Sequence, residues 1–75
     1  MDRITLLENE LVKLAGPLGK FVVKKQMKQL GINTPYVDDK GYEKLINASV
    51  TNAVFDPIKQ KNAIKELTAK LLAQG

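Results

Sequence analysis

Residues 11–23 have the sequence LVKLAGPLGKFVV, in which Gly16-Pro17 separates two apolar segments that also carry lysine. Proline is tolerated in the first turn of a helix and disrupts a helix further in. The Gly-Pro step therefore predicts a hinge, with one helix ending at Gly16 and the next beginning at Pro17. Asp56-Pro57 repeats the arrangement, with an acid at the N-cap and proline at the first helical position. These two steps divide the chain into short helices.

On either side of both proline steps, apolar residues recur at spacings of three and four, which is the period of an amphipathic helix. The pattern predicts four helices, over the ranges Arg3 to Ala15, Pro17 to Leu30, Lys40 to Val54 and Pro57 to Ala73. A connector is expected from Ile32 to Gly41, and Gly31 is expected to end the second helix in the left-handed conformation. Acids precede three of these helices, and the predicted N-caps are Asp2, Asp38 or Asp39, and Asp56. We therefore expect a single all-α domain over residues 1–75, a compact bundle of four short helices.

The core of such a short chain is small. A domain of this size buries only about 60% of its unfolded surface. The chain has no Cys, so no disulfide adds stability. The residues predicted at the centre of the core are Phe21, Val22, Leu45, Ile46, Ile64 and Leu67. The small core and the wide apolar arc of the second helix favour a homodimer.

The composition excludes several kinds of chemistry. The chain has no His and no Cys, which removes His-based acid–base catalysis and the usual ligands of transition metals. Asp38-Asp39, an adjacent acidic pair, stands where the third helix needs an N-cap. We therefore expect a protein that is not an enzyme and that binds no cofactor or metal.

The positive charge is unevenly distributed. The net charge is +4, and five lysines and no acid lie between Leu11 and Val37. Lys20, Lys24 and Lys28 follow one another at intervals of four, which places them on one ridge of the second helix. The ridge is compatible with a solvated surface that attracts an acidic partner, or with contacts to the phosphates of a nucleic acid.

Residues 26–37 resemble a helix-turn-helix, with Gly31 at the turn and Ile32 and Val37 at apolar positions. Met27 departs from that motif because the position requires a small residue. The acids Asp38 and Asp39 would lie on the recognition helix, where they would repel phosphate. The alternative function is therefore a small basic nucleic-acid-binding protein. Because of these departures from the motif, we favour a protein partner over a nucleic acid.

Residues 11–25, with Gly16-Pro17-Leu18-Gly19 at their centre, resemble a motif of small helical domains in prokaryotic signalling proteins. In those domains the step is Gly-Pro-Ile-Ala, and the domain often lies at the C-terminus of Ser/Thr kinases or regulators. The similarity extends over about residues 6–72, with Leu18 and Gly19 in place of Ile and Ala. The resemblance implies a non-enzymatic module for protein interaction or oligomerisation, such as a regulatory adaptor in signalling. It brings no known functional residues.

The predicted binding residues lie on the second helix. Leu18 and Val22 would anchor a protein partner, because buried apolar residues supply most interface energy. Lys20, Lys24 and Lys28 would steer an acidic partner towards the surface. No apolar run approaches the roughly 18 residues of a membrane span. Nor does the N-terminal sequence resemble a signal peptide, so a cytoplasmic location is the expected default.

Overall fold

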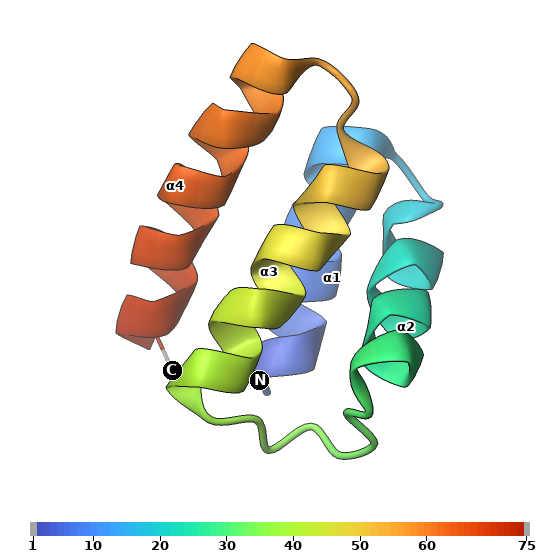
Figure 1. Ribbon diagram of the computed structural model, residues 1–75, viewed down its shortest axis with the longest axis vertical. Helices are drawn as coiled ribbons and strands as arrows, with labels where there is room; N and C mark the ends of the chain where they lie inside the picture. Colours follow the sequence, from blue (N-terminus) through green and yellow to red (C-terminus); the bar gives the residue numbers. More distant parts are fainter. Residues whose placement is uncertain (1, 75) are drawn as a thin grey trace.

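Four helices alternate in direction along the chain in a computed structural model that describes residues 2–74. They are α1 (Arg3–Ala15), α2 (Gly19–Leu30), α3 (Asp39–Ala53) and α4 (Pro57–Gln74) (Figure 1). α1 and α3 each contact all three other helices, whereas α2 and α4 lie on opposite sides of them without touching in the described part of the chain. No strand occurs in residues 2–74. The all-α bundle of four short helices is confirmed.

Three helices begin at an aspartate N-cap, as the sequence predicts. Asp2 caps α1, Asp38 caps α3 and Asp56 caps α4. In each case a carboxylate oxygen accepts a hydrogen bond from a first-turn backbone N–H, over distances of 2.7 to 3.1 Å. These bonds satisfy amide groups that have no partner inside the helix, which fixes where the helix starts.

The turn between α1 and α2 differs from the prediction. The second helix begins at Gly19, not at Pro17. Gly16 has φ 82° and ψ −167°, a conformation restricted almost entirely to glycine. The Gly19 amide donates to the Gly16 carbonyl oxygen at 2.9 Å, which closes a tight turn over Pro17 and Leu18. Proline at 17 therefore belongs to this turn, and Leu18 occupies the N-cap position of α2.

Gly31 ends α2 in the left-handed conformation, with φ 74° and ψ 22°, as expected. Its amide donates to Lys28, and the amide of Ile32 donates to Met27. This pair of hydrogen bonds is the Schellman arrangement, which usually brings an apolar contact with it. Met27 and Ile32 both pack against the core. The connection to α3 then continues as far as Asp38 without helix.

The core lies between α1 and α3 and is closed by α2 and α4. Its buried apolar residues are Ile4, Leu7, Leu11, Val23, Tyr42, Leu45, Ile46, Val50, Ala63, Leu67 and Leu71. Of the six predicted core residues, three are buried, namely Leu45, Ile46 and Leu67. Ile64 is partly buried against the core, and Val22 is half-buried.

Phe21 is the error in the predicted core, because its side chain is 69% exposed. α2 turns Gly19 and Val23 towards the bundle, and both are buried. Phe21 lies two residues from each of them, a rotation of about 200° around the helix. Its side chain therefore points to solvent.

Candidate docking surface

Exposed apolar side chains gather at one end of the bundle. The turn from α1 to α2 and the turn from α3 to α4 lie at the same end, opposite the chain termini (Figure 1). Five large apolar side chains on or beside these turns are 48 to 83% exposed. They are Leu14, Leu18, Phe21, Phe55 and Ile58, and together they are called the apolar end. Single exposed apolar residues are ordinary, but several in one region indicate binding.

Phe55 is the most exposed member of the apolar end, at 83%. It precedes the N-cap Asp56, where an apolar residue usually packs on an apolar residue at the fourth helical position. That position is Gln60, whose side-chain amide donates instead to the carbonyl oxygens of Val54 at 2.9 Å and Thr51 at 3.2 Å. These bonds hold the turn while Phe55 stays in solvent. Phe55 is not among the binding residues predicted from the sequence, although the polar residue at 60 was a readable signal.

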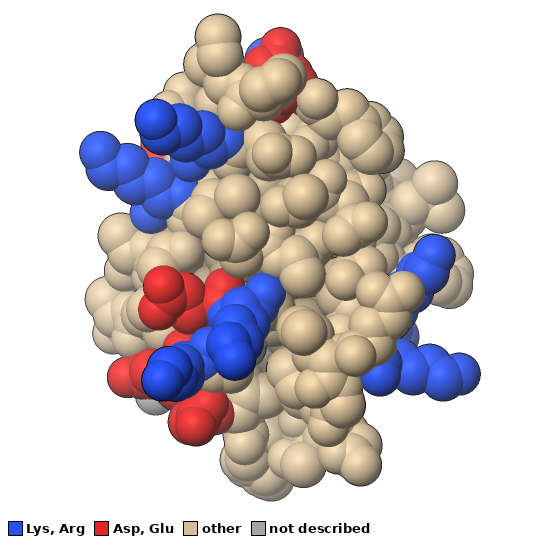
Figure 2. Space-filling view, viewed as in Figure 1, with Lys and Arg blue, Asp and Glu red and all other residues tan. Residues whose placement is uncertain are grey.

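The rim of the apolar end is basic. Residues 11–22 and 52–62, which form this end, contain four lysines and one acid. The lysines are Lys13, Lys20, Lys59 and Lys61. The acid is Asp56, whose carboxylate already accepts two backbone hydrogen bonds in the first turn of α4. Acidic side chains gather instead towards the other end of the molecule, where α3 begins (Figure 2).

The lysines of α2 and those of α4 do not form one surface. α2 and α4 lie on opposite sides of the α1–α3 pair and make no contact within residues 2–74. In Figure 2 basic side chains appear at the upper left and at the right edge, and others lie beside acidic side chains at the lower left; uncharged surface covers much of the face between them. The two groups of lysines therefore do not merge into one continuous ridge along the helices.

The predicted binding residues lie in different surroundings. Leu18 is 68% exposed and belongs to the apolar end, and Lys20 is exposed in the first turn of α2 beside it. Val22 is half-buried, so it offers less surface to a partner. Farther along α2, two exposed lysines border a groove instead; they are Lys24 and Lys28.

This groove lies between α1, α2 and the connection that follows α2, and its volume is about 570 Å³. Apolar residues in it include Ile4 and Met27. Glu8 also lines it, and its Oε2 is buried without a hydrogen-bond partner among the described residues. Lys24 and Lys28 are the basic residues among those that line the groove, so the groove itself offers Glu8 cations. The buried oxygen therefore does not by itself indicate a ligand.

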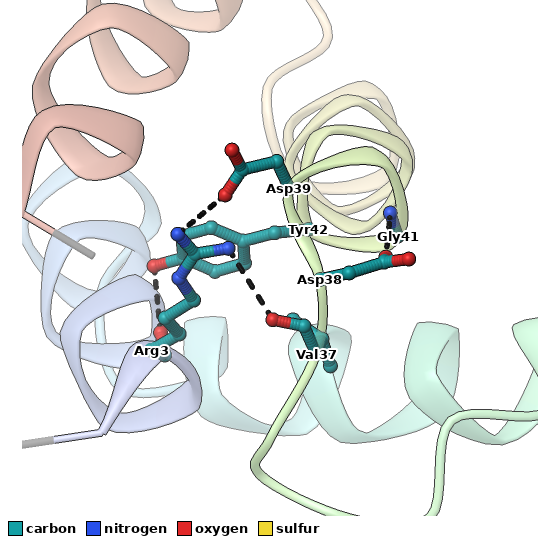
Figure 3. Close-up of polar contacts among 6 residues, drawn as sticks. All are labelled: Arg3, Val37, Asp38, Asp39, Gly41 and Tyr42. Carbon is teal, nitrogen blue, oxygen red and sulfur yellow. Dashed lines mark hydrogen bonds and ion pairs between the residues drawn. The ribbon is translucent and has the colours of Figure 1, made fainter.

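A polar cluster around Arg3 joins the start of α1 to the start of α3 (Figure 3). Nη2 of Arg3 lies 2.6 Å from Oδ1 of Asp39, and Nη1 donates to the carbonyl oxygen of Val37 at 3.3 Å. The guanidinium lies 5.0 Å from the centre of the Tyr42 ring, and the Tyr42 hydroxyl donates to the Arg3 carbonyl oxygen at 2.7 Å. Nη1 and Nη2 of Arg3 and the Tyr42 hydroxyl each donate within the chain, so the cluster ties the start of α1 to the start of α3.

Comparison with protein-family models, with curated proteins and with solved structures finds no match. The resemblance to Gly-Pro-Ile-Ala domains therefore stays a prediction. Within residues 2–74, no helix combines the length and apolar character needed to cross a membrane. The same residues include no cluster of three side chains suited to hold a metal ion.

Proposed function

We propose that this protein is a non-enzymatic protein-interaction module that docks its partner on the apolar end. The observation that carries the proposal is the exposure of five large apolar side chains at a single end of a small bundle. Removing one such side chain from water contributes about 1.5–3 kcal/mol. A partner that covers this end therefore gains the most binding free energy.

The turns that carry these side chains are ordered before a partner arrives. Gly16 and Gly19 close the first turn by a backbone hydrogen bond of 2.9 Å. Asp56 and Gln60 hold the second turn with side-chain hydrogen bonds. An ordered surface loses little conformational freedom on binding, which favours affinity. A role as a regulatory adaptor or as an oligomerisation element rests in addition on the Gly-Pro resemblance.

Nucleic-acid binding receives less support. Lys20, Lys24 and Lys28 are exposed along α2, which favours contacts to phosphate. α2 and α4 do not touch within the described residues, so their lysines do not join into one continuous ridge that phosphates could follow. The connection between α2 and α3, residues 31–38, is also longer than the three or four residues of a helix-turn-helix turn.

The test is selection of peptides from a random library against the immobilised protein, followed by NMR mapping of each bound peptide. We expect the shifted resonances to centre on Leu18, Phe21 and Phe55. Substituting Phe55→Ser should abolish binding, whereas the matched control Tyr36→Ser, at an exposed residue in the α2–α3 connection, should leave it unchanged. Peptides that map elsewhere would overturn the proposal.

Sedimentation velocity of the pure protein tests the other possible partners, which are a second copy of the chain and a nucleic acid. A dimer that Phe55→Ser dissociates would support self-association through the apolar end. The same measurement with duplex DNA at low and high salt tests the alternative. A salt-sensitive DNA complex that Phe55→Ser leaves intact, together with no selected peptide, would favour the nucleic-acid function over the one proposed.

A further inference from the structure

We infer that the occupant of the apolar end is an acidic amphipathic helix of a partner protein. The inference rests on the proposed function and adds the chemistry of the partner. It combines three observations. The charge around the apolar end is positive, residues 2–74 contain no strand edge with which a partner could pair, and the first turn of α2 has no side-chain cap.

The charge around the apolar end is positive and largely uncompensated. Lys13 lies 3.3 Å from Glu10 and is paired within α1. Lys20, Lys59 and Lys61 have no ion-pair partner among the described residues and are exposed. The Asp56 carboxylate caps α4 by accepting hydrogen bonds from two backbone amides. A partner that covers the apolar side chains must therefore bring acids to their edge, or it leaves three ammonium groups facing a desolvated rim.

The described chain offers a partner no strand edge. Residues 2–74 contain helices and their connections only, so a bound segment cannot gain main-chain hydrogen bonds by adding to a sheet. It must satisfy its own backbone while it buries side chains. A helix does this, and an amphipathic helix presents apolar side chains on one face and charges beside them.

The first turn of α2 adds a preference for acidic groups at this end. Leu18 occupies its N-cap position, and no side chain caps the helix. The other three helices do not share this feature, because an aspartate side chain bonds the first turn of each. The Gly19 amide already donates to Gly16, so a carboxylate of a helix seated on Leu18 and Phe21 would meet the amides of Lys20 and Phe21 together with the Lys20 ammonium group.

A second copy of this chain fits the apolar end less well. Two copies that met through it would bring Lys20, Lys59 and Lys61 of one copy against the same lysines of the other, and like charges at an interface are unfavourable. An anionic membrane also has the negative charge that the basic rim requires, but it does not present a single helix to the apolar end. Both are therefore outcomes that the experiment distinguishes.

The experiment uses two fluorescent peptides of about five helical turns. Both carry leucine at positions i, i+3, i+4 and i+7, and the remaining positions are mainly Glu in one peptide and mainly Lys in the other. We expect the Glu peptide to bind at least about tenfold more tightly, because several exposed charge pairs each contribute a few tenths to 1 kcal/mol. Its affinity should fall as salt is raised.

Protein variants locate the site. The double substitution Lys20→Glu and Lys59→Glu should weaken the Glu peptide about tenfold, whereas Lys44→Glu, an exposed lysine of α3 away from this end, should not. Phe21→Ser with Phe55→Ser should weaken any peptide seated on the apolar end. Circular dichroism confirms that each variant folds, and all the substituted side chains are exposed.

The outcomes separate the inference from the proposed function. If the Lys peptide binds equally well and still depends on Phe21 and Phe55, the docking surface stands and the acidic partner is overturned. If neither peptide binds while phosphatidylserine vesicles bind and Phe55→Ser weakens them, both proposals are overturned in favour of a lipid surface. Dimerisation blocked by Phe55→Ser, without binding of the Glu peptide, would overturn the inference in favour of a second copy.

Discussion

Gly19 of α2 lies directly against the backbone of Leu11 in α1. A Cβ placed on Gly19 would come within 2.6 Å of the Leu11 carbonyl carbon and 2.7 Å of its oxygen. Such distances are far below contact, and the obstacle is backbone that cannot rotate away. Glycine at 19 therefore sets how closely the first two helices approach, and with it which side of α2 faces the core.

Gly19→Ala is expected to destabilise the fold. The methyl group forces α2 away from α1, and overpacking of this kind costs about 1–3 kcal/mol, against a helix-propensity gain of at most about 1 kcal/mol. Urea unfolding followed by circular dichroism measures the loss. Gly41→Ala is the milder comparison, because its added Cβ would meet only Oδ1 of Asp38, at 2.9 Å, and would disturb the N-cap of α3 without meeting backbone. A variant at 19 as stable as wild type would contradict the close approach.

Gly16 and Gly31 both have positive φ but should differ in their tolerance of substitution. Gly31, at φ 74° and ψ 22°, is in the left-handed helical region, which asparagine also adopts. Gly16, at φ 82° and ψ −167°, is in a region that only glycine enters readily. We expect Gly31→Asn to cost about 1 kcal/mol or less, and Gly16→Asn to cost about 1–3 kcal/mol. Equal losses of unfolding free energy in urea would show that the two turns are not distinct in solution.

The sequence predicts the helix boundaries well because they depend on local chemistry. Asp2, Asp38 and Asp56 each satisfy backbone amides a few residues away, so the pattern of acids is sufficient to locate three helix starts. Gly31 likewise ends α2 by its own conformation. The start of α2 was misplaced by two residues because Pro17 fits a turn as well as a first helical turn.

The side of α2 that faces the core could not be predicted in the same way. Leu18, Phe21, Val22 and Val23 form an apolar arc that extends over most of the helix, so the period alone leaves several orientations open. The contact of Gly19 with α1 decides among them, and it buries Val23 and exposes Phe21. The apolar end was unpredictable for a related reason, because it joins two turns that only the tertiary fold brings to one end.

Tyr42 is expected to make stability fall at high pH. Its side chain is buried, and burial raises the pKa of Tyr42 to about 12, against about 10 in an unfolded chain. A raised pKa means that the folded state holds the proton more tightly. The contribution to stability is therefore complete below about pH 10 and is lost as the pH rises towards 12.

Tyr42→Phe isolates this contribution. The variant loses the hydrogen bond to the Arg3 carbonyl oxygen, which costs about 1 kcal/mol near neutral pH. Lysines also titrate at high pH, but they do so in both proteins. The difference in unfolding free energy between wild type and variant should therefore shrink, then reverse, between about pH 10 and 12. A constant difference over that range would mean that Tyr42 ionises in the folded state as easily as in the unfolded chain.

Glu10 links α1 to α4 and should make stability fall at low pH. Burial tends to raise the pKa of Glu10, but hydrogen bonds from Lys70 at 3.2 Å and Lys13 at 3.3 Å outweigh it and lower the pKa. A lowered pKa gives stability that is present above the unfolded value and lost as the pH falls through the folded one.

Lys70→Met is expected to cost less than about 1 kcal/mol at neutral pH, because Lys70 is half exposed and water screens the pair. The control is Lys65→Met, an exposed lysine on the same helix without a partner among the described residues. Thermal unfolding at several pH values measures both. The loss at 70 should shrink as the pH falls through the lowered pKa of Glu10, and it should disappear once Glu10 is protonated in folded and unfolded chains alike. A loss that persists there would reflect the packing of the lysine stem and not the ion pair.

Ser49 should be better replaced by alanine. It lies on the buried face of α3, and its side chain is fully buried. Its Oγ has no hydrogen-bond partner among the described residues. A buried hydroxyl without a partner costs about 1–3 kcal/mol of desolvation. Ser49→Ala removes that cost and gains helix propensity, so the midpoint of urea unfolding should rise by an amount equivalent to about 1 kcal/mol.

Ser49→Gly removes the same hydroxyl but opens a gap and weakens the helix, so it should be less stable than Ser49→Ala by about 1 kcal/mol. If Ser49→Ala were itself less stable than wild type, the hydroxyl would have to donate a hydrogen bond in solution, and the helix carbonyl four residues earlier would be its acceptor.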